Sequence, residues 1–288
     1  MASNDEQKVQ TTGHTWDGDL AEYNNPLPQW WVWVFYGTVV FAVIYWILYP
    51  AWPVGDTYTQ GVLEYNKRAK LDNTLQKVET GQLYPERQEA LSQIAQKNPV
   101  AILDDPELMN FVNSSGKVLF GDNCAPCHGS GGQGVKGHYP NLTDGAWLYG
   151  GKPSDIHETL VKGRNGYMPG HENKLSEQQI EALAMYEGSL AGEDWAEGNP
   201  EKVARGEELF QGDEAACYAC HGRDAKGNQT LGAPNLTDAI WLYGGDKATV
   251  FETLAKGRGG EMPAWEDRLS GDQIKILAAY VHSLGGGQ

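Results

Sequence analysis

The sequence predicts an all-α protein with a single N-terminal transmembrane helix followed by two tandem copies of a small helical domain. Three observations support this fold class. Residues 30–49 carry no charge, a set of short motifs returns after 94 residues, and each copy ends in an apolar-periodic segment with a helix-start signal. Neither copy contains a convincing strand, because no segment alternates apolar and polar residues over a sufficient length.

Residues 30–49 predict the transmembrane helix. The segment has 20 residues, and as a helix it would extend about 30 Å, the thickness of a hydrocarbon core. Aromatic residues cluster at its two ends, as at membrane interfaces: Trp30, Trp31 and Trp33, then Trp46, Tyr49 and Trp52. The alternative, a helix buried in a protein core, is disfavoured by the length of the segment and its complete lack of charged residues. A cleaved signal peptide fits poorly, because acidic residues dominate the preceding segment.

The rest of the chain contains an internal repeat. Pro140-Asn-Leu-Thr-Asp144 returns as Pro234–Asp238, and Trp147-Leu-Tyr-Gly-Gly151 returns as Trp241–Gly245, each 94 residues later. This period is too long for a solenoid unit and indicates duplication of a whole domain. We expect domains at 108–190 and 203–288, an inter-domain linker at 191–202, and a polar linker at 50–107. Within the polar linker we expect a helix around 85–96 and assign no role.

The closing helix of each copy is predicted by a capping box. Ser176 is followed by Gln179, and Ser270 by Gln273. At this spacing the two side chains and the backbone N–H groups at a helix start satisfy each other's hydrogen bonds. Apolar residues then recur on one helical face in both segments.

All four cysteines of the chain lie in two Cys-x-x-Cys-His motifs, which are Cys124, Cys127 and His128, then Cys217, Cys220 and His221. This pentapeptide is the attachment sequence for c-type haem. Each thiol can form a thioether with a vinyl group of the porphyrin, and the histidine becomes the proximal ligand of the iron. We therefore expect two covalently bound haem c groups.

A methionine is the expected second axial ligand at each iron. Met168 follows His128 by 40 residues and Met262 follows His221 by 41, and a proline follows each methionine. No other methionine or spare histidine has a repeat counterpart, so ligation by two histidines at one centre is the weaker alternative. The spacing does not tell whether the methionines swap between the two irons. Met/His ligation fills both axial positions and favours outer-sphere electron transfer.

These motifs give both halves a resemblance to class I cytochrome c domains over residues 108–288. The segments 11–18 and 24–31, directly before the apolar span, resemble the start of subunit III of cbb3-type cytochrome c oxidases, the dihaem subunit. The first resemblance implies two tandem class I cytochrome c domains, in which the carbonyls of Pro140 and Pro234 would orient the proximal histidines. The alternative is that both are loop prolines.

The resemblance also implies function. The chain would be an electron-transfer subunit without catalytic residues of its own. It would accept electrons from a cytochrome c or the bc1 complex and pass them to the monohaem and catalytic subunits of the oxidase. Donation to another terminal reductase, a dihaem peroxidase and a gas-sensing module are the alternatives.

The resemblance places the protein in a bacterial cell inner membrane, with residues 1–29 in the cytoplasm, one span, and the haem domains in the periplasm. Basic residues contribute little to this orientation. Residues 50–66 contain no lysine or arginine, and Lys67, Arg68 and Lys70 favour the opposite one.

Charge and the remaining motifs exclude other classes. A net charge of −16 argues against a nucleic-acid partner. It suits the attraction of a basic redox partner, although solubility explains it equally well. Gly129–Gly134 matches a dinucleotide-binding pattern but follows no strand. A zinc site made of all four cysteines would need an unusually long spacing, and a thioredoxin-like dithiol lacks its βαβ context.

Overall fold

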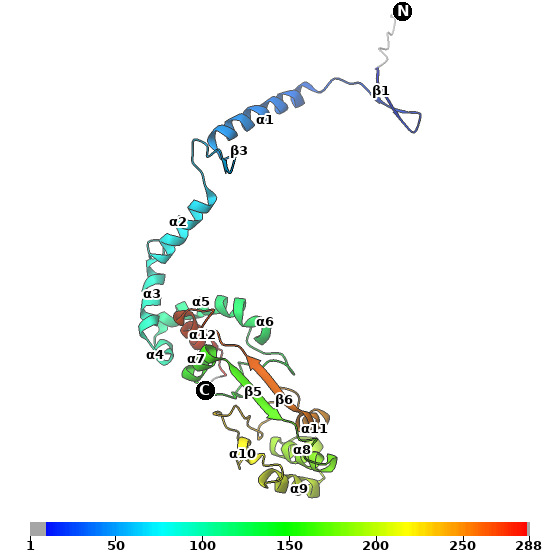
Figure 1. The fold of residues 1–288 in the computed structure, drawn as a ribbon, viewed down its shortest axis with the longest axis vertical. Coiled ribbons are helices and arrows are strands. Elements are labelled where there is room, and N and C mark those ends of the chain that lie inside the picture. The colour runs from blue at the N-terminus through cyan, green and yellow to red at the C-terminus, as the bar shows by residue number, and fades with distance from the viewer. Residues whose placement is uncertain (1–9, 287–288) are drawn as a thin grey trace, which may run out of the picture. The chain divides into compact units, whose positions relative to one another are not determined.

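The computed structural model describes residues 10–286 (Figure 1). The chain divides into two compact units, Met1–Leu83 and Tyr84–Gln288. The first contains two short hairpins and two helices: β1 (Thr11–Trp16), β2 (Leu20–Tyr23), α1 (Gln29–Leu48), β3 (Pro53–Val54), β4 (Thr57–Tyr58) and α2 (Lys67–Glu79).

Helix α1 confirms the helix predicted over residues 30–49, with each end one residue earlier. It begins after Pro28 and none of its side chains is buried within the protein. Its length and apolar composition are sufficient to cross a membrane. The Trp30 and Trp33 side chains are among its most exposed.

The second unit contains most of the helices. They are α3 (Pro85–Gln96), α4 (Pro99–Leu103), α5 (Pro106–Asn123), α6 (Ala125–His128), α7 (Pro153–Lys162), α8 (Glu177–Ala191), the 3-10 turn η1 (Asp194–Ala196), α9 (Pro200–Gln211), α10 (Tyr218–His221), α11 (Lys247–Lys256) and α12 (Gly271–Ser283). The helix expected around 85–96 is confirmed as α3. Both predicted capping boxes form, one at α8 and one at α12.

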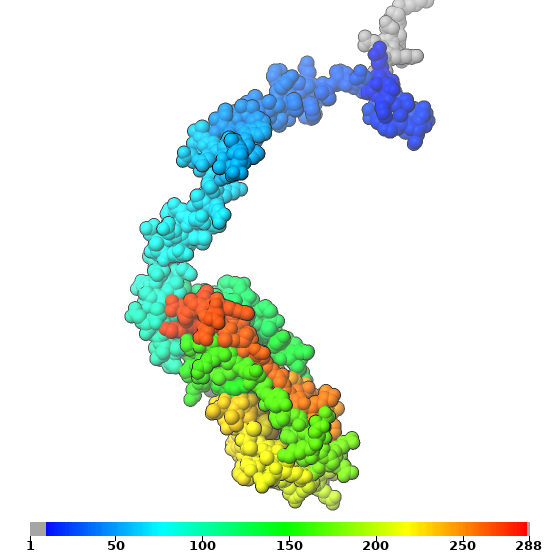
Figure 2. Space-filling model, viewed as in Figure 1, coloured from blue at the N-terminus to red at the C-terminus, as the bar shows by residue number. Residues whose placement is uncertain are grey.

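The two repeats exchange their closing helices. Helix α8 follows the first Cys-x-x-Cys-His motif but packs against α9 and α11 of the second repeat. Helix α12 of the second repeat packs against α5 and α7 of the first (Figure 1). In the space-filling view the orange and red C-terminal residues lie among green residues of the first repeat (Figure 2). Each hydrophobic core is therefore built from both repeats.

Matching contacts hold the exchanged helices in place. A Cβ on Gly116 of α5 would collide with Tyr280 of α12, and the Tyr280 ring lies 5.8 Å from that of Phe120. In the other core, a Cβ on Gly206 of α9 would collide with α8 next to Tyr186. The absence of a side chain lets each helix pair cross closely, which is why a glycine stands at the same place in both copies.

A two-stranded ribbon marks the crossover. Strands β5 (Arg164–Pro169) and β6 (Gly257–Met262) are antiparallel, with Arg164 opposite Met262 and Met168 opposite Arg258 (Figure 1). The sequence predicted no strand here. The pairing joins distant segments that are rich in glycine and lack an alternating pattern, so only the tertiary structure brings them together.

Residues 84–105, to which the sequence assigned no role, complete the first core. Ile94 of α3 and Ile102 of α4 are fully buried against Ile276 and Ala279 of α12. The Lys275 Nζ donates hydrogen bonds to the carbonyls of Ile94 (3.1 Å) and Ala95 (2.7 Å) at the end of α3. These contacts attach the segment to the exchanged helix.

Candidate functional site

The first Cys-x-x-Cys-His motif lies in the core that contains α5, α7 and α12. Cys124 ends α5, and the single-turn helix α6 presents Cys127 and His128. The His128 side chain is buried, with 9% of the residue exposed. Its Nδ1 lies 3.0 Å from the carbonyl oxygen of Pro140, which confirms the contact predicted for this proline.

The second motif has the same arrangement in the core of α8, α9 and α11. Helix α10 presents Cys220 and His221, and the His221 Nδ1 lies 3.1 Å from the carbonyl oxygen of Pro234. A carbonyl can only accept, so Nδ1 carries the proton in both rings and donates it. The lone pair of each Nε2 remains available to a metal.

Burial favours the neutral form of the histidine and of the first cysteine in each motif. It lowers the pKa of His128 and of His221, against the smaller opposing effect of the proline carbonyls. It also raises the pKa of the Cys124 thiol to about 11 and that of Cys217 to about 12. A neutral imidazole suits an iron ligand.

Each methionine lies in the core of the other repeat. Met168 packs against the cluster that includes Leu183 and Phe210, and Cys217 and Trp241 pack against the same cluster. Met262 packs against the cluster that includes Phe120 and Cys124, as does Trp147. Met262 therefore shares a core with Cys124, and Met168 shares a core with Cys217; the spacing did not predict which core each methionine would join.

Two glycines allow this exchange of methionines. Gly163 has φ +69°, and a Cβ there would collide with the carbonyl oxygen of Met262. Gly257 has φ +77°, and a Cβ there would collide with the carbonyl oxygen of Met168. Only glycine combines this conformation with so close a backbone approach. Both glycines lie in a further short repeat, Lys-Gly-Arg at 162–164 and at 256–258, but the spacing gave no sign of the backbone that each would face.

The arginine that follows each glycine anchors its strand. The Arg164 guanidinium lies 4.7 Å from the centre of the Tyr149 ring, and its Nε donates to Thr159 at 2.8 Å. Arg258 makes the same contacts with Tyr243 and Thr253. Sequence reasoning missed these pairs, although their residues all belong to the repeated motifs.

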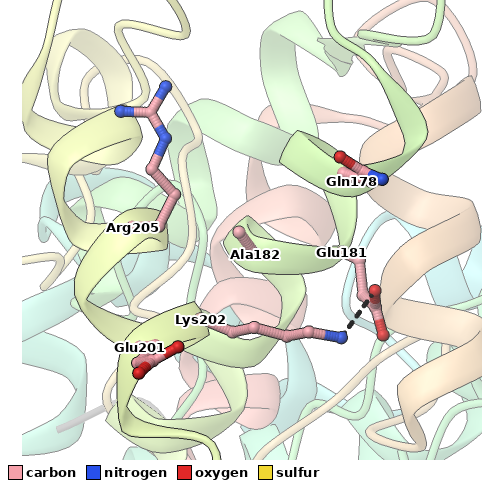
Figure 3. Close-up of a pocket in the computed structure, with 6 residues that line it drawn as sticks. All are labelled: Gln178, Glu181, Ala182, Glu201, Lys202 and Arg205. Atoms are coloured by element: carbon pink, nitrogen blue, oxygen red, sulfur yellow. Dashed lines mark ion pairs between the residues drawn. The ribbon is translucent and has the colours of Figure 1, made fainter.

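The described residues offer no competing metal cluster. Within residues 10–286, no group of three or more His, Cys, Asp or Glu side chains is placed to hold a metal ion. The two cysteine pairs lie against different cores, so a zinc site that joins all four thiols is not formed. A hollow between α8 and α9 is lined by charged and polar side chains, including the Lys202–Glu181 ion pair (Figure 3). It contains neither cysteine nor histidine.

The arrangement of side chains fits haem c. Each site offers two thiols and a neutral, oriented imidazole on one short helix, with a thioether sulfur in the same core. The surrounding residues are apolar or aromatic, including Leu142 at the first site and Leu236 at the second. Apolar surroundings and a thioether ligand both favour the ferrous state of a haem.

Two family models match the chain. Residues 8–56 match the N-terminal domain of cytochrome oxidase-cbb3, FixP. Residues 112–186 and 201–281 each match the model described as cytochrome c oxidase, cbb3-type, subunit III. The two matches of the second model coincide with the two repeats, and each contains one Cys-x-x-Cys-His motif.

The chain is also similar to named proteins over nearly its full length. It is 47% identical to the cbb3-type cytochrome c oxidase subunit FixP of Azorhizobium caulinodans, covering 96% of this chain and 94% of the relative. It is 46% identical to FixP of Bradyrhizobium diazoefficiens, covering 96% and 95%. Subunit CcoP of Azospirillum sp. is 43% identical, with 97% and 96% covered.

Among solved structures, a Kuenenia stuttgartiensis reducing HAO-like protein complex is similar over 59% of this chain and 96% of that chain. The identity is 19% and the TM-score 0.19. A likeness at this level carries no argument about fold or function.

Proposed function

The chain belongs to the family of cbb3-type cytochrome c oxidase subunit III, and from this premise we propose that it relays single electrons through two covalently bound haem c groups. One haem would be attached to Cys124 and Cys127, and the other to Cys217 and Cys220. The observation that supports this most strongly is the pair of matching sites, each with an oriented histidine and a methionine in one apolar core.

We assign the axial ligands across the repeats. His128 and Met262 would ligate the iron attached through the first motif, and His221 and Met168 the iron attached through the second. The packing of each methionine and the close backbone approach at Gly163 and Gly257 support this pairing. Haem c supplies a one-electron couple when bound.

The protein's own groups prepare that couple for fast, outer-sphere transfer. The carbonyls of Pro140 and Pro234 hold the imidazole rings in one orientation and tautomer. The apolar cores exclude water, and the methionine occupies the position where a substrate would otherwise bind. Catalysis of oxygen reduction therefore belongs to a partner subunit.

The finer architecture follows the same reasoning. Two class I cytochrome c units would form, helical apart from the short strand pairs, with their closing helices exchanged. Helix α1 would cross the bacterial inner membrane once, with residues 1–29 in the cytoplasm and both haem units in the periplasm. The donor would be a cytochrome c or the bc1 complex, and the acceptors the monohaem and catalytic subunits.

The test is to purify the intact complex from a host that matures c-type cytochromes. A pyridine haemochrome assay and the mass of the isolated chain should show two haem c groups per chain. The complex should also contain b-type haem and copper from the catalytic subunit. A chain that matures with one haem or none would refute the proposal, and recovery with a different reductase would favour the alternative acceptor.

Carbon monoxide separates the proposal from a dihaem peroxidase. Both native irons should be closed by histidine and methionine, so the isolated subunit in its ferrous state should not bind the gas. Binding at one native haem with full occupancy would instead indicate an exchangeable ligand and favour the peroxidase.

A further inference from the structure

Glu187 of α8 is a buried carboxyl group that the proposed electron transfer does not yet use. Only 5% of the residue is exposed. No hydrogen bond or ion pair joins its side chain to any other residue in the described range 10–286, and burial is what shifts its pKa. No side-chain oxygen of the described residues is both fully enclosed and without a hydrogen bond, so the Glu187 oxygens keep a slight contact with the surface. A carboxyl with so little exposure and no cation bound to it is still costly in its charged form, so its presence in a core needs an explanation.

The carboxyl lies within electrostatic reach of the second haem-attachment site. A negative charge on Glu187 acts on the Cys217 thiol and helps to raise its pKa, which places the two side chains in electrostatic reach of each other. Glu187 also shares its helix with Ile180, Leu183 and Ala184, all buried in the core that contains Cys217 and Met168. A charge at this position would therefore act on the bound iron through a medium that screens weakly.

The first site has no such group. The repeat offset of 94 residues places Val281 of α12 at the position of Glu187. Val281 is buried in the core that contains Cys124. The two sites thus match in their ligands and differ by one carboxyl group, which provides an internal reference within one chain.

Several of the charged groups on neighbouring elements have other partners. Lys202 of α9 and Lys247 of α11 bind Glu181, at 2.8 and 2.7 Å. Arg205 of α9 contacts Glu208 and Glu214. The charge of Glu207 on α9 helps to raise the pKa of Tyr186, and the charge of Lys174 acts to lower the pKa of Cys217. Glu193, beside η1, accepts a hydrogen bond from Trp241. Burial lowers the pKa of His221, and within the described residues no cation forms an ion pair with Glu187.

We propose that Glu187 couples electron uptake at the haem attached to Cys217 and Cys220 to uptake of one proton, and that the other haem lacks this coupling. When the donor supplies an electron, Fe³⁺ becomes Fe²⁺ and the site loses one positive charge. The Glu187 carboxylate then takes one proton from solvent and becomes a neutral carboxylic acid. Reoxidation releases that proton, so charge and atoms balance in each cycle.

The direction of the pH effect follows from the charges. The ferric iron favours the carboxylate and the ferrous iron favours the acid, so the group holds its proton more tightly after reduction. Burial alone already raises the pKa of Glu187 to about 8. The equilibrium constant for reduction should therefore fall with rising pH, by up to about tenfold per pH unit within the titration range.

The test uses potentiometric titration of the purified dihaem subunit with both haems attached, between about pH 6 and pH 9, the range around the raised pKa. The haem attached to Cys217 should show the pH dependence and the haem attached to Cys124 a weaker one. Glu187→Gln should abolish the difference while both haems keep low-spin spectra. Glu177→Gln, an exposed carboxyl at the start of the same helix, is the matched control and should leave the dependence unchanged.

A second measurement does not depend on the variant folding. In reduced-minus-oxidised infrared spectra of the wild-type subunit, reduction should produce the carbonyl band of one protonated carboxylic acid. Its absence would overturn the proposal, as would a pH dependence that survives Glu187→Gln. The inference rests on the proposed dihaem function, but the failures are distinguishable. Loss of two low-spin haems would refute the function, whereas two normal haems without a carboxyl signal would refute only the coupling.

Discussion

The crossed ligation of the two irons can be tested by combining substitutions at histidines and methionines. If His128 and Met262 serve one iron, replacing both should damage a single haem and leave the other with its full ligand set. If His128 and Met168 are replaced instead, one ligand is lost from each iron and no intact site remains. The pairing by sequence distance makes the opposite prediction for the same two double variants.

The structure supplies the magnitude. Met168 lies opposite Arg258 on the ribbon, and Met262 lies further along the same strand as Arg258, so the two methionines are about 13 Å apart along the strands. An iron–sulfur bond cannot bridge such a shift, so each methionine can serve only one site. Met→Leu substitution nearly conserves volume and costs under about 1.5 kcal/mol in a core. Loss of the iron ligand should therefore dominate the result.

The assay is the absorption band of methionine-ligated ferric haem, measured per chain together with carbon monoxide binding. His128→Gly with Met262→Leu should retain half of the wild-type band, and His128→Gly with Met168→Leu should retain none. Carbon monoxide should bind one haem in the first variant and two in the second. The reverse pattern would refute the exchange and restore the pairing by sequence distance.

Three further predictions rest on the same structure. Gly163→Ala and Gly257→Ala should each lower the melting temperature, because a positive φ costs an alanine about 1–2 kcal/mol and its Cβ would also collide with the facing methionine carbonyl. The control, Gly121→Ala, lies on the exposed face of α5 with open space around it and should be neutral or stabilising. Equal melting temperatures for all three variants would contradict the argument. Gly198 is exposed, with nothing near its Cβ position, so a protease site can be inserted there. After cleavage, the two fragments should remain associated on size-exclusion chromatography, because α8 and α12 each pack against the other fragment. Separation of the fragments without denaturant would indicate independent tandem domains. Lys202 and Lys247 lower the pKa of Glu181 to about 2; Figure 3 shows the pair with Lys202. Both ion pairs should stabilise the fold above the ordinary carboxyl pKa of 4.5 and lose that effect as the pH falls towards 2. Glu181→Gln should therefore shift the urea midpoint at neutral pH but not at the acid end of this range, while Glu177→Gln should shift neither.

The local elements were accessible from the sequence because their causes are local. The charge-free span predicted α1 to within one residue, and Ser176 with Gln179 predicted the start of α8 through their own side-chain hydrogen bonds. The proline carbonyls that orient His128 and His221 also follow their histidines at a short distance along the chain. In each case the interacting groups are near neighbours in the sequence.

Contacts between the repeats could not be predicted in the same way. The copies are so alike that Tyr280 packs against a glycine and a phenylalanine of α5 just as Tyr186 packs against a glycine and a phenylalanine of α9. The hydrophobic pattern of the sequence is therefore the same whichever closing helix joins each core. The strand pair of Gly-rich segments and the burial of Ile94 and Ile102 against α12 likewise depend on partners far away in the chain. Glu187 interrupts the apolar face of its helix, but only the packing shows that it is buried.

The composition of the two sites could be read from the residues alone: which cysteines can hold a porphyrin, which histidine stands beside them, and that two methionines recur at matching places. Covalent spacing and residue chemistry predict these points within short stretches of chain. Which core each methionine joins emerged only from the folded chain, because that choice depends on the path taken after β5. The apolar pattern of the sequence allows either closing helix to pack in either core. Only the packing in the folded protein shows which helix joins which core.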